Sequence, residues 1–190
     1  MDHFYKSIAG AFTFPDFYAH LAQQLSRTTH SARVAEVGVY AGQSAAYLGV
    51  ELLNRGVHDA QITLVDRFDQ VSREAVVKNL APIASVVGSV IQGDSAASAN
   101  KFADGVFDAV FIDADHAYES VARDIDAWLP KVRSGGTLSG HDFMLEIPGV
   151  IRAVMERFDR VAVWRGSPLP AGAAMGAVGA YYPVWQVVVP

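Results

Sequence analysis

The sequence has 190 residues, of which 51% are hydrophobic and 18% are charged, and this balance predicts a single folded domain spanning residues 1–190. Its net charge of −5, without a cluster of lysines or arginines, argues against a nucleic acid as the main partner. The absence of cysteine excludes disulfides, thiolate metal sites and a cysteine nucleophile.

Neither a secretion signal nor a membrane segment is predicted. Residues 1–6 lack the basic start and apolar core of a signal peptide. The longest uncharged apolar stretches, 81–91 and 171–185, are too short to span a bilayer. Together with the lack of cysteine, these features predict a cytoplasmic protein that has no membrane partner.

The chain begins with a pattern typical of an amphipathic helix over residues 14–25, which is expected to pack beside a sheet or to cover the mouth of a cofactor site. Residues 33–39 are apolar and β-branched and predict a buried strand. A helix is expected from Ser44 to about Asn54, where Asn-Arg-Gly forms a stop signal.

The turn between this strand and helix has the pattern Glu-x-Gly-x-x-x-Gly, from Glu36 through Gly38 to Gly42. It lacks the third glycine of the dinucleotide fingerprint, whose packed turn suits a pyrophosphate. A carboxylate at the turn suits a positively charged ligand, such as S-adenosylmethionine, which carries a sulfonium and an ammonium group. The alternative is that the two glycines only shape a βα turn.

The next strand, residues 61–66, ends in Asp66, close to where such folds place a carboxylate for the ribose hydroxyls. A strand-end cap is the alternative role for Asp66. A helix capped by Ser72 is expected over residues 72–80, followed by a strand over 86–92.

Gly93-Asp94-Ser95 ends that strand on the same side of the sheet. Asp94 is a candidate for binding the adenine amino group, and Ser95 is expected to cap the next helix. An equally weighted alternative makes Asp94 only a cap or turn residue.

A second dense group of polar residues follows the apolar strand 106–112. A helix through 121–129 comes next and is expected to be closed by Pro130 and Ser-Gly-Gly at 134–136, before a strand over 137–140. Because neighbouring parallel strands end at the same edge of a sheet, the polar residues after these two strands are expected around one pocket. They are Asp113, Asp115, His116, His141 and Asp142.

The remaining chain predicts a helix over 150–158, a strand over 160–164, a mobile loop over 166–180 and a final strand over 181–189. Two late strands without a helix between them predict an antiparallel edge on an otherwise parallel sheet. The expected fold is therefore a doubly wound α/β sheet with helices on both faces.

Five motifs in order resemble class I S-adenosylmethionine-dependent methyltransferases: the glycine turn, Asp66, Gly93-Asp94-Ser95, Phe-Ile-Asp-x-Asp-His, and Gly-Gly-Thr-Leu-Ser-Gly-His-Asp. The segments 111–116 and 140–142 more narrowly resemble the small-molecule O-methyltransferase branch. That branch includes macrocin-type sugar O-methyltransferases and cephalosporin-hydroxylase-like proteins, with catechol O-methyltransferases more distant. The resemblance covers roughly residues 34–143 and implies a Rossmann-like seven-stranded sheet with one antiparallel strand.

The resemblance implies that Glu36 and Gly38 face the methionine end of the cofactor, that Asp66 holds the ribose, and that Asp94 and Ser95 lie near the adenine. The residues expected around S-adenosylmethionine are Glu36, Gly38, Tyr40, Gly42, Ser44, Asp66, Arg67, Asp94, Ser95 and Asp113.

In metal-dependent members, an acid after the fourth strand and an acidic pair after the fifth bind Mg²⁺, which here implies Asp113, His141 and Asp142. Imidazole suits Mn²⁺, Fe²⁺ or Zn²⁺ better than Mg²⁺. Either the metal therefore differs from Mg²⁺, or His141 is not a ligand and acts as the base. The candidate metal cofactor is a divalent ion, Mg²⁺ or Mn²⁺, and a metal-free site is the remaining alternative.

The predicted activity is O-methylation of a small-molecule hydroxyl group. Its proton would go to one of the candidate catalytic residues, Asp113, Asp115, His116 or His141. Asp115 could instead cap the following helix, and the two histidines could be packed loop residues. Two rival classes are a cofactor-binding protein with other, hydroxylase-like chemistry and a nicotinamide-dependent oxidoreductase. The acceptor is open, and a homodimer is the expected assembly.

Overall fold

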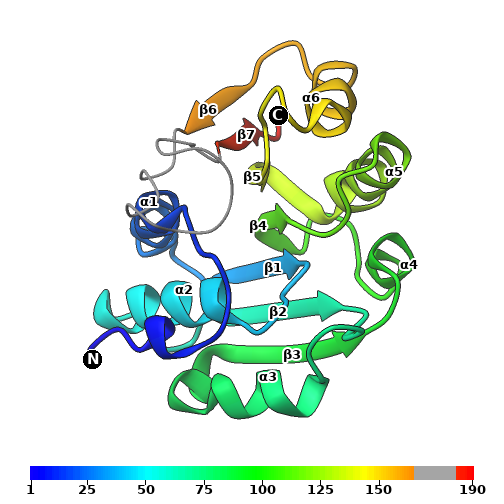
Figure 1. Ribbon diagram of the computed structural model, residues 1–190. Helices are drawn as coiled ribbons and strands as arrows, with labels where there is room; N and C mark the ends of the chain where they lie inside the picture. The colour runs from blue at the N-terminus through cyan, green and yellow to red at the C-terminus, as the bar shows by residue number, and fades with distance from the viewer. Residues whose placement is uncertain (165–182) are drawn as a thin grey trace.

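The computed structural model describes residues 1–164 and 183–190 and shows one twisted sheet between two layers of helices (Figure 1). Among these residues, seven strands pair in the order β3-β2-β1-β4-β5-β7-β6. The strands are β1 (Arg33–Val37), β2 (Gln61–Asp66), β3 (Val87–Gln92), β4 (Phe107–Ile112), β5 (Val132–Gly140), β6 (Ala162–Trp164) and β7 (Val184–Val188).

The first five strands pair in parallel, whereas β7 is antiparallel to both β5 and β6. This confirms the predicted doubly wound α/β fold. The antiparallel strand does not form the edge itself, because the short strand β6 pairs along its outer side.

The helices cover both faces of the sheet, with α1 and α2 on one side and α4, α5 and α6 on the other (Figure 1). Each layer of helices packs on the sheet through its own hydrophobic core, and the side chains of β4 alternate between the two. Ala109 and Phe111 belong to the core under α1 and α2, and Val110 and Ile112 belong to the core under α4, α5 and α6. The helices are α1 (Pro15–Leu25), α2 (Gln43–Asn54), α3 (Arg73–Asn79), α4 (Ser95–Ala99), α5 (Tyr118–Trp128) and α6 (Pro148–Met155), and three 3₁₀ helices span Tyr5–Ser7, Ala81–Val86 and Leu129–Lys131.

One local prediction was wrong, because Ser-Gly-Gly at 134–136 does not close a helix. Strand β5 already begins at Val132, and its pairing with β4 shifts register between Phe107 and Ala109. Gly135 has a φ of 74°, which a glycine adopts without the steric penalty of a side chain. The two glycines therefore form an irregularity inside the strand.

Other predicted boundaries moved by a few residues. Ser72 caps α3 as expected, since its hydroxyl accepts a hydrogen bond from the N–H of Ala75. The predicted helix over 150–158 is α6, which begins two residues earlier and ends three residues earlier. The predicted loop over 166–180 and the start of the strand over 181–189 lie outside the described residues.

The strand order reverses between β1 and β4, which start the two halves of the sheet. In doubly wound sheets, the crevice for ligands opens at the carboxyl ends of the strands beside this reversal. No helix in the described part of the chain is both long enough and apolar enough to cross a membrane.

Candidate active site

A cavity of about 510 Å³ opens at the carboxyl ends of β1, β2, β3 and β4. This volume falls within the range of roughly 300–1,000 Å³ that is common for small-molecule sites. The N-terminal segment 10–14 and the first turns of α5 complete its wall. The predicted residues that line it are Gly38, Tyr40, Ser44, Asp66, Arg67, Asp94, Ser95, Asp113, Asp115 and His116.

The glycine turn is held by Asp66 rather than left open for a phosphate. One carboxylate oxygen of Asp66 accepts hydrogen bonds from the N–H groups of Val39 (2.7 Å) and Tyr40 (3.0 Å). Its other oxygen accepts one from the N–H of Phe68 (2.7 Å). A pyrophosphate needs such backbone donors, so this turn is poorly suited to a dinucleotide. The second oxygen keeps a lone pair for a further donor, such as a ribose hydroxyl.

Glu36 lies behind this turn and is not among the residues that line the cavity. Its side chain points to the α1–α2 face, where it accepts hydrogen bonds from the hydroxyls of Tyr18 (3.0 Å) and Ser44 (2.6 Å). Burial raises the pKa of Glu36 to about 8 and outweighs the opposing effect of those two hydrogen bonds. Gly42, also expected at the cofactor, is the N-cap residue of α2 with a φ of 87°, and a Cβ there would meet Leu80 at 3.3 Å; it is not among the residues that line the cavity.

Glu36→Gln is expected to flatten the pH dependence of stability. The folded protein keeps a proton on Glu36 that the unfolded chain releases as pH rises from 4.5 to about 8. The free energy of unfolding of the wild type should therefore fall across that window, by up to about 5 kcal/mol at 1.36 kcal/mol per pKa unit. Urea unfolding at pH 5, 6.5 and 8 measures the free energy of unfolding of the wild type and of Glu36→Gln. Glu74→Gln, at an exposed glutamate, is the control and should keep the pH dependence of the wild type. An equal pH slope in Glu36→Gln and wild type would refute the raised pKa of Glu36.

At the β3 side of the cavity, Asp94 rather than Ser95 caps α4. One oxygen of Asp94 accepts a hydrogen bond from the N–H of Ala97 (2.9 Å), and the other accepts one from the guanidinium of Arg123 (3.0 Å). Ser95 was the predicted cap, but it is the first helical residue, so its hydroxyl lies past the capping position. Asp124 also lines this part of the cavity, and burial raises its pKa to about 6.

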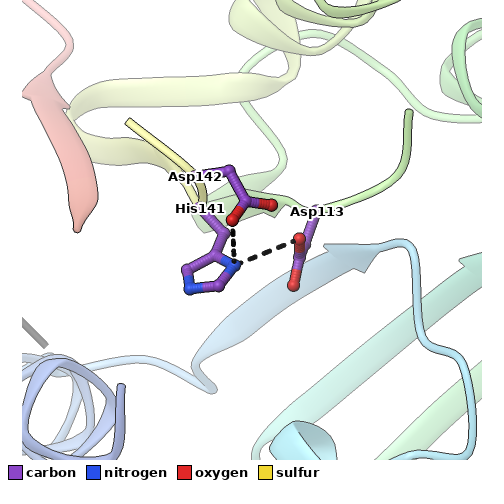
Figure 2. Close-up of side chains that lie close together, drawn as sticks. All are labelled: Asp113, His141 and Asp142. Carbon is purple, nitrogen blue, oxygen red and sulfur yellow. Dashed lines mark ion pairs between the residues drawn. The ribbon is translucent and has the colours of Figure 1, made fainter. Parts of the chain in front are cut away.

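At the β4 side, Asp113, His141 and Asp142 meet (Figure 2). The Nδ1 atom of His141 lies 3.5 Å from a carboxylate oxygen of Asp113 and 3.3 Å from one of Asp142. Backbone pairing fixes these residues, because the N–H of Asp113 donates to Val37 O (2.7 Å) and that of His141 to Ile112 O (3.1 Å). The five residues predicted around one pocket divide here: Asp113, Asp115 and His116 line the cavity, whereas His141 and Asp142 lie behind it, next to Asp113.

Two further residues extend this cluster. The Nε2 atom of His116 lies 2.8 Å from the second oxygen of Asp142, and the Nε2 atom of His141 lies 3.1 Å from the hydroxyl of Thr13. Asp142 has a φ of 59°, a left-handed conformation that is uncommon outside glycine and recurs at functional sites.

The carboxylates control the protonation of both histidines. Burial disfavours a charged His141, but the adjacent Asp113 and Asp142 outweigh it and raise its pKa to about 10. The hydrogen bond with Asp142 raises the pKa of His116. Burial alone would raise the pKa of Asp142, yet its contacts with the two histidines hold it well below the ordinary value. A cation at neutral pH is therefore favoured between the acids.

The cluster also fits a divalent metal. Asp113, His141 and Asp142 each offer a ligand atom, and these atoms lie within 4.8 Å of one another. Two carboxylates and one imidazole form a donor set that Mn²⁺, Fe²⁺ or Zn²⁺ accepts readily. The Thr13 hydroxyl can hold the other ring nitrogen of His141 and so orient the imidazole.

Asp115 organises the loop between β4 and α5. Its carboxylate accepts hydrogen bonds from the N–H groups of His116 (2.7 Å) and Ala117 (3.1 Å) and from the hydroxyl of Ser120 (2.6 Å). These contacts resemble the capping alternative, although Ala117 occupies the N-cap position itself. Asp115 borders the cavity at the same time.

Several cavity residues escaped the sequence analysis. Phe12 and Phe14 line the cavity from an N-terminal segment that carries no motif. The sequence analysis expected the helix over 14–25 to cover the mouth of the site, but it named neither residue. Phe14 lies against the His141 ring, with 4.7 Å between centroids. The position of Asp124 could have been noticed in the sequence, because it is an acid on the apolar stripe of α5, next to Val121 and Ile125. In the structure only 2% of Asp124 is exposed.

Solved structures with similar folds include several methyltransferases. A SAM-dependent O-methyltransferase from Thermotoga maritima matches with a TM-score of 0.68 and 15% identity over 96% of this chain and 68% of its own. An O-methyltransferase from Bacillus cereus, in complex with SAH, matches with a TM-score of 0.65 and 18% identity. The match covers 92% of this chain and 80% of that protein's chain. An rRNA methylase from Streptococcus thermophilus matches with a TM-score of 0.63 and 13% identity. The match covers 93% of this chain and 94% of that protein's chain.

A comparison with curated proteins found no match. A family model described as a methyltransferase domain matches residues 35–143, more than half of the chain and nearly the range in which the sequence motifs fall. This match confirms the predicted methyltransferase class and overturns the oxidoreductase alternative, which the engaged N–H groups of the glycine turn also disfavour. The chain belongs to the methyltransferase-domain family.

Proposed function

We propose that this protein transfers the methyl group of S-adenosylmethionine to a hydroxyl group of a small molecule. The observation that carries the proposal is the cluster of Asp113, His141 and Asp142 beside the cavity. Methyl transfer to oxygen needs a group that orients the hydroxyl and receives its proton, and this cluster provides both kinds of group.

The charges around the cavity favour a cationic ligand. Acidic side chains predominate in its lining, and its two arginines face acids, Arg67 facing Asp69 and Arg123 facing Asp94. A sulfonium and an ammonium group are compatible with such a site, whereas a pyrophosphate is not. The remaining lone pair of Asp66 supports a hydrogen bond from a ribose hydroxyl. Tyr40 and Ser44, which also line the cavity, are proposed to border the methionine end.

The acceptor hydroxyl is proposed to bind at Asp113, on the side of the cavity opposite Asp94. Asp113 accepts the hydrogen bond of the hydroxyl, and His141, which is itself paired with Asp142, holds the Asp113 carboxylate in place. Phe14 offers an apolar wall next to His141. A divalent cation held by Asp113, His141 and Asp142 would lower the pKa of the acceptor hydroxyl.

The proposed partner is a small hydroxylated molecule rather than RNA. The net charge of −5 supports this choice because a polyanion would be repelled. The absence of cysteine supports a cytoplasmic location, and a homodimer is proposed from the frequency of that assembly alone.

The test is calorimetric titration of the apo protein with S-adenosylhomocysteine, with EDTA, Mg²⁺ or Mn²⁺ present. We expect micromolar binding in each condition and a separate heat for Mn²⁺ that disappears in Asp142→Ala. Methyl transfer from radiolabelled S-adenosylmethionine to phenols, sugars and polyketide alcohols is then measured in the same buffers. No binding of the nucleoside would overturn the proposal, and binding with methylation at nitrogen or carbon alone would overturn the O-methyl assignment.

A further inference from the structure

Residues 3–14 form an extended segment that lies beside α2 and ends at the active-site cluster (Figure 1). We call this segment the N-terminal strap. It precedes the range 35–143 that the family model matches. The structure describes no β-strand in it, only a turn of 3₁₀ helix at Tyr5–Ser7, so sheet pairing does not hold it in place. Its position therefore depends on contacts with side chains of the neighbouring helix.

Gln43, in the first turn of α2, binds the middle of the strap. Its side-chain amide donates hydrogen bonds to the carbonyl oxygens of Tyr5 and Ile8, both at 3.2 Å. Gly10 follows with a φ of 143°, and a Cβ there would lie 3.1 Å from Gln43 Oε1. The backbone of the strap thus lies directly against this side chain.

Tyr47, one turn further along α2, contacts three rings of the strap. Its ring stacks on that of His3, with 4.4 Å between centroids and 14° between planes. It also meets the rings of Tyr5 and Phe12, each at a centroid distance of 5.2 Å. Glu51, on the next turn, lies 2.8 Å from Nε2 of His3 and supports the first contact. Aromatic pairs in such geometries stabilise beyond the area they bury, so Tyr47 is the main anchor of the strap.

The other end of the strap reaches the catalytic cluster. Thr13 is 6% exposed, and its hydroxyl lies 3.1 Å from Nε2 of His141. The Phe14 ring lies against the same imidazole, with 4.7 Å between centroids. The opposite ring nitrogen, Nδ1, faces Asp113 and Asp142. The strap therefore supplies two of the contacts that fix the orientation of this imidazole.

We propose that Tyr47 is a positioning residue for methyl transfer: it holds the strap on α2, and the strap places the Thr13 hydroxyl on His141. This inference rests on the proposed function. Tyr47 is not among the residues that line the cavity, but its partner Phe12 immediately precedes Thr13. Loss of the Thr13 contact would let the imidazole turn. The Asp113 carboxylate, which is proposed to accept the hydrogen bond of the acceptor hydroxyl, would then be held less firmly.

The experiment is a double-mutant cycle between Tyr47→Ala and Thr13→Val. It measures kcat for transfer from radiolabelled S-adenosylmethionine to the phenol, sugar or polyketide alcohol that wild type methylates fastest. Each substitution should lower kcat about tenfold or more, as loss of a contact that orients a functional side chain commonly does. The double variant should be no slower than the slower single variant, because both changes remove one contact. Tyr47→Phe keeps the ring and Thr13→Ser keeps the hydroxyl, so these matched controls should retain wild-type kcat.

A second measurement, hydrogen exchange, requires no acceptor. The amides of the strap should exchange faster in Tyr47→Ala than in wild type or Tyr47→Phe, whereas those of β1 and β4 should stay protected and so show that the variant is folded. If Tyr47→Ala does not fold, His3→Ala replaces it, because His3 is an exposed residue whose loss removes the ring stacked on Tyr47.

Unchanged exchange of the strap overturns the anchoring role of Tyr47. Losses of kcat that multiply in the double variant, or wild-type kcat in Thr13→Val, overturn the link through His141. If wild type neither binds S-adenosylhomocysteine nor methylates any acceptor, the proposed function itself fails, and exchange decides separately whether Tyr47 holds the strap.

Discussion

Gly38→Ala is expected to destabilise the protein by about 3 kcal/mol or more and to abolish cofactor binding. Gly38 has a φ of 88°, and a Cβ there would lie 2.0 Å from the carbonyl oxygen of Asp113. Neither backbone can move aside easily. The N–H of Gly38 donates to Val65 O (2.9 Å), and the N–H of Asp113 donates to Val37 O (2.7 Å). Relief of the clash would separate β1 from β4 where the cavity begins.

Gly56→Ala is the matched control, measured by urea unfolding and by titration with S-adenosylhomocysteine. Gly56 has a similar φ of 79°, but a Cβ there would meet nothing within 4 Å. Its substitution should therefore show the conformational penalty alone, about 1–2 kcal/mol, and leave ligand binding intact. Equal destabilisation by the two substitutions would mean that the contact with Asp113 does not determine the requirement for glycine.

Asp113→Asn is expected to lower kcat for methyl transfer by about 10²–10³-fold. The amide keeps the shape of the side chain but removes the negative charge that faces His141 and the acceptor hydroxyl. Affinity for S-adenosylhomocysteine should change by less than about tenfold, because the other contacts of the nucleoside remain. Turnover with radiolabelled S-adenosylmethionine and titration with the product analogue separate the two effects.

Asp104→Asn provides the comparison, because Asp104 precedes the other end of β4 and pairs with Lys131 at the surface. It should match wild type in both measurements. Wild-type turnover in Asp113→Asn would move the proton-accepting role to another residue of the site. A loss of nucleoside binding as large as the loss of kcat would show that Asp113 acts mainly on the cofactor.

The chain order of apolar strands and amphipathic helices was sufficient to predict the sheet and the edge at which the site lies. Parallel strands end at one edge, so the acids after β2, β3 and β4 had to meet there. The details that failed depend on contacts between distant segments. The register shift at Gly135 arises from pairing with β4 and cannot be seen in the local glycine pattern.

The same reason explains the residues that the sequence analysis missed or could not place. Thr13 meets His141 across 128 positions of the chain, and nothing in the local sequence of either residue records that contact. Glu36 is predicted at the cofactor from its place in the turn, yet it alternates with Ala35 and Val37 along β1 and so faces α1, where the hydroxyl of Tyr18 donates to it. Asp124 lines the cavity on α5, a helix that packs beside α4, and this packing between segments cannot be seen in the local sequence of α5.

The hydrogen bonds from Val39 and Tyr40 to Asp66 order the glycine turn before any ligand arrives. The conformational entropy of that turn is therefore lost during folding rather than during binding. Association should be close to rigid docking, with a rate limited by entry into the cavity rather than by rearrangement of the turn. The amide protons of Val39 and Tyr40 should exchange slowly with solvent even in the empty protein.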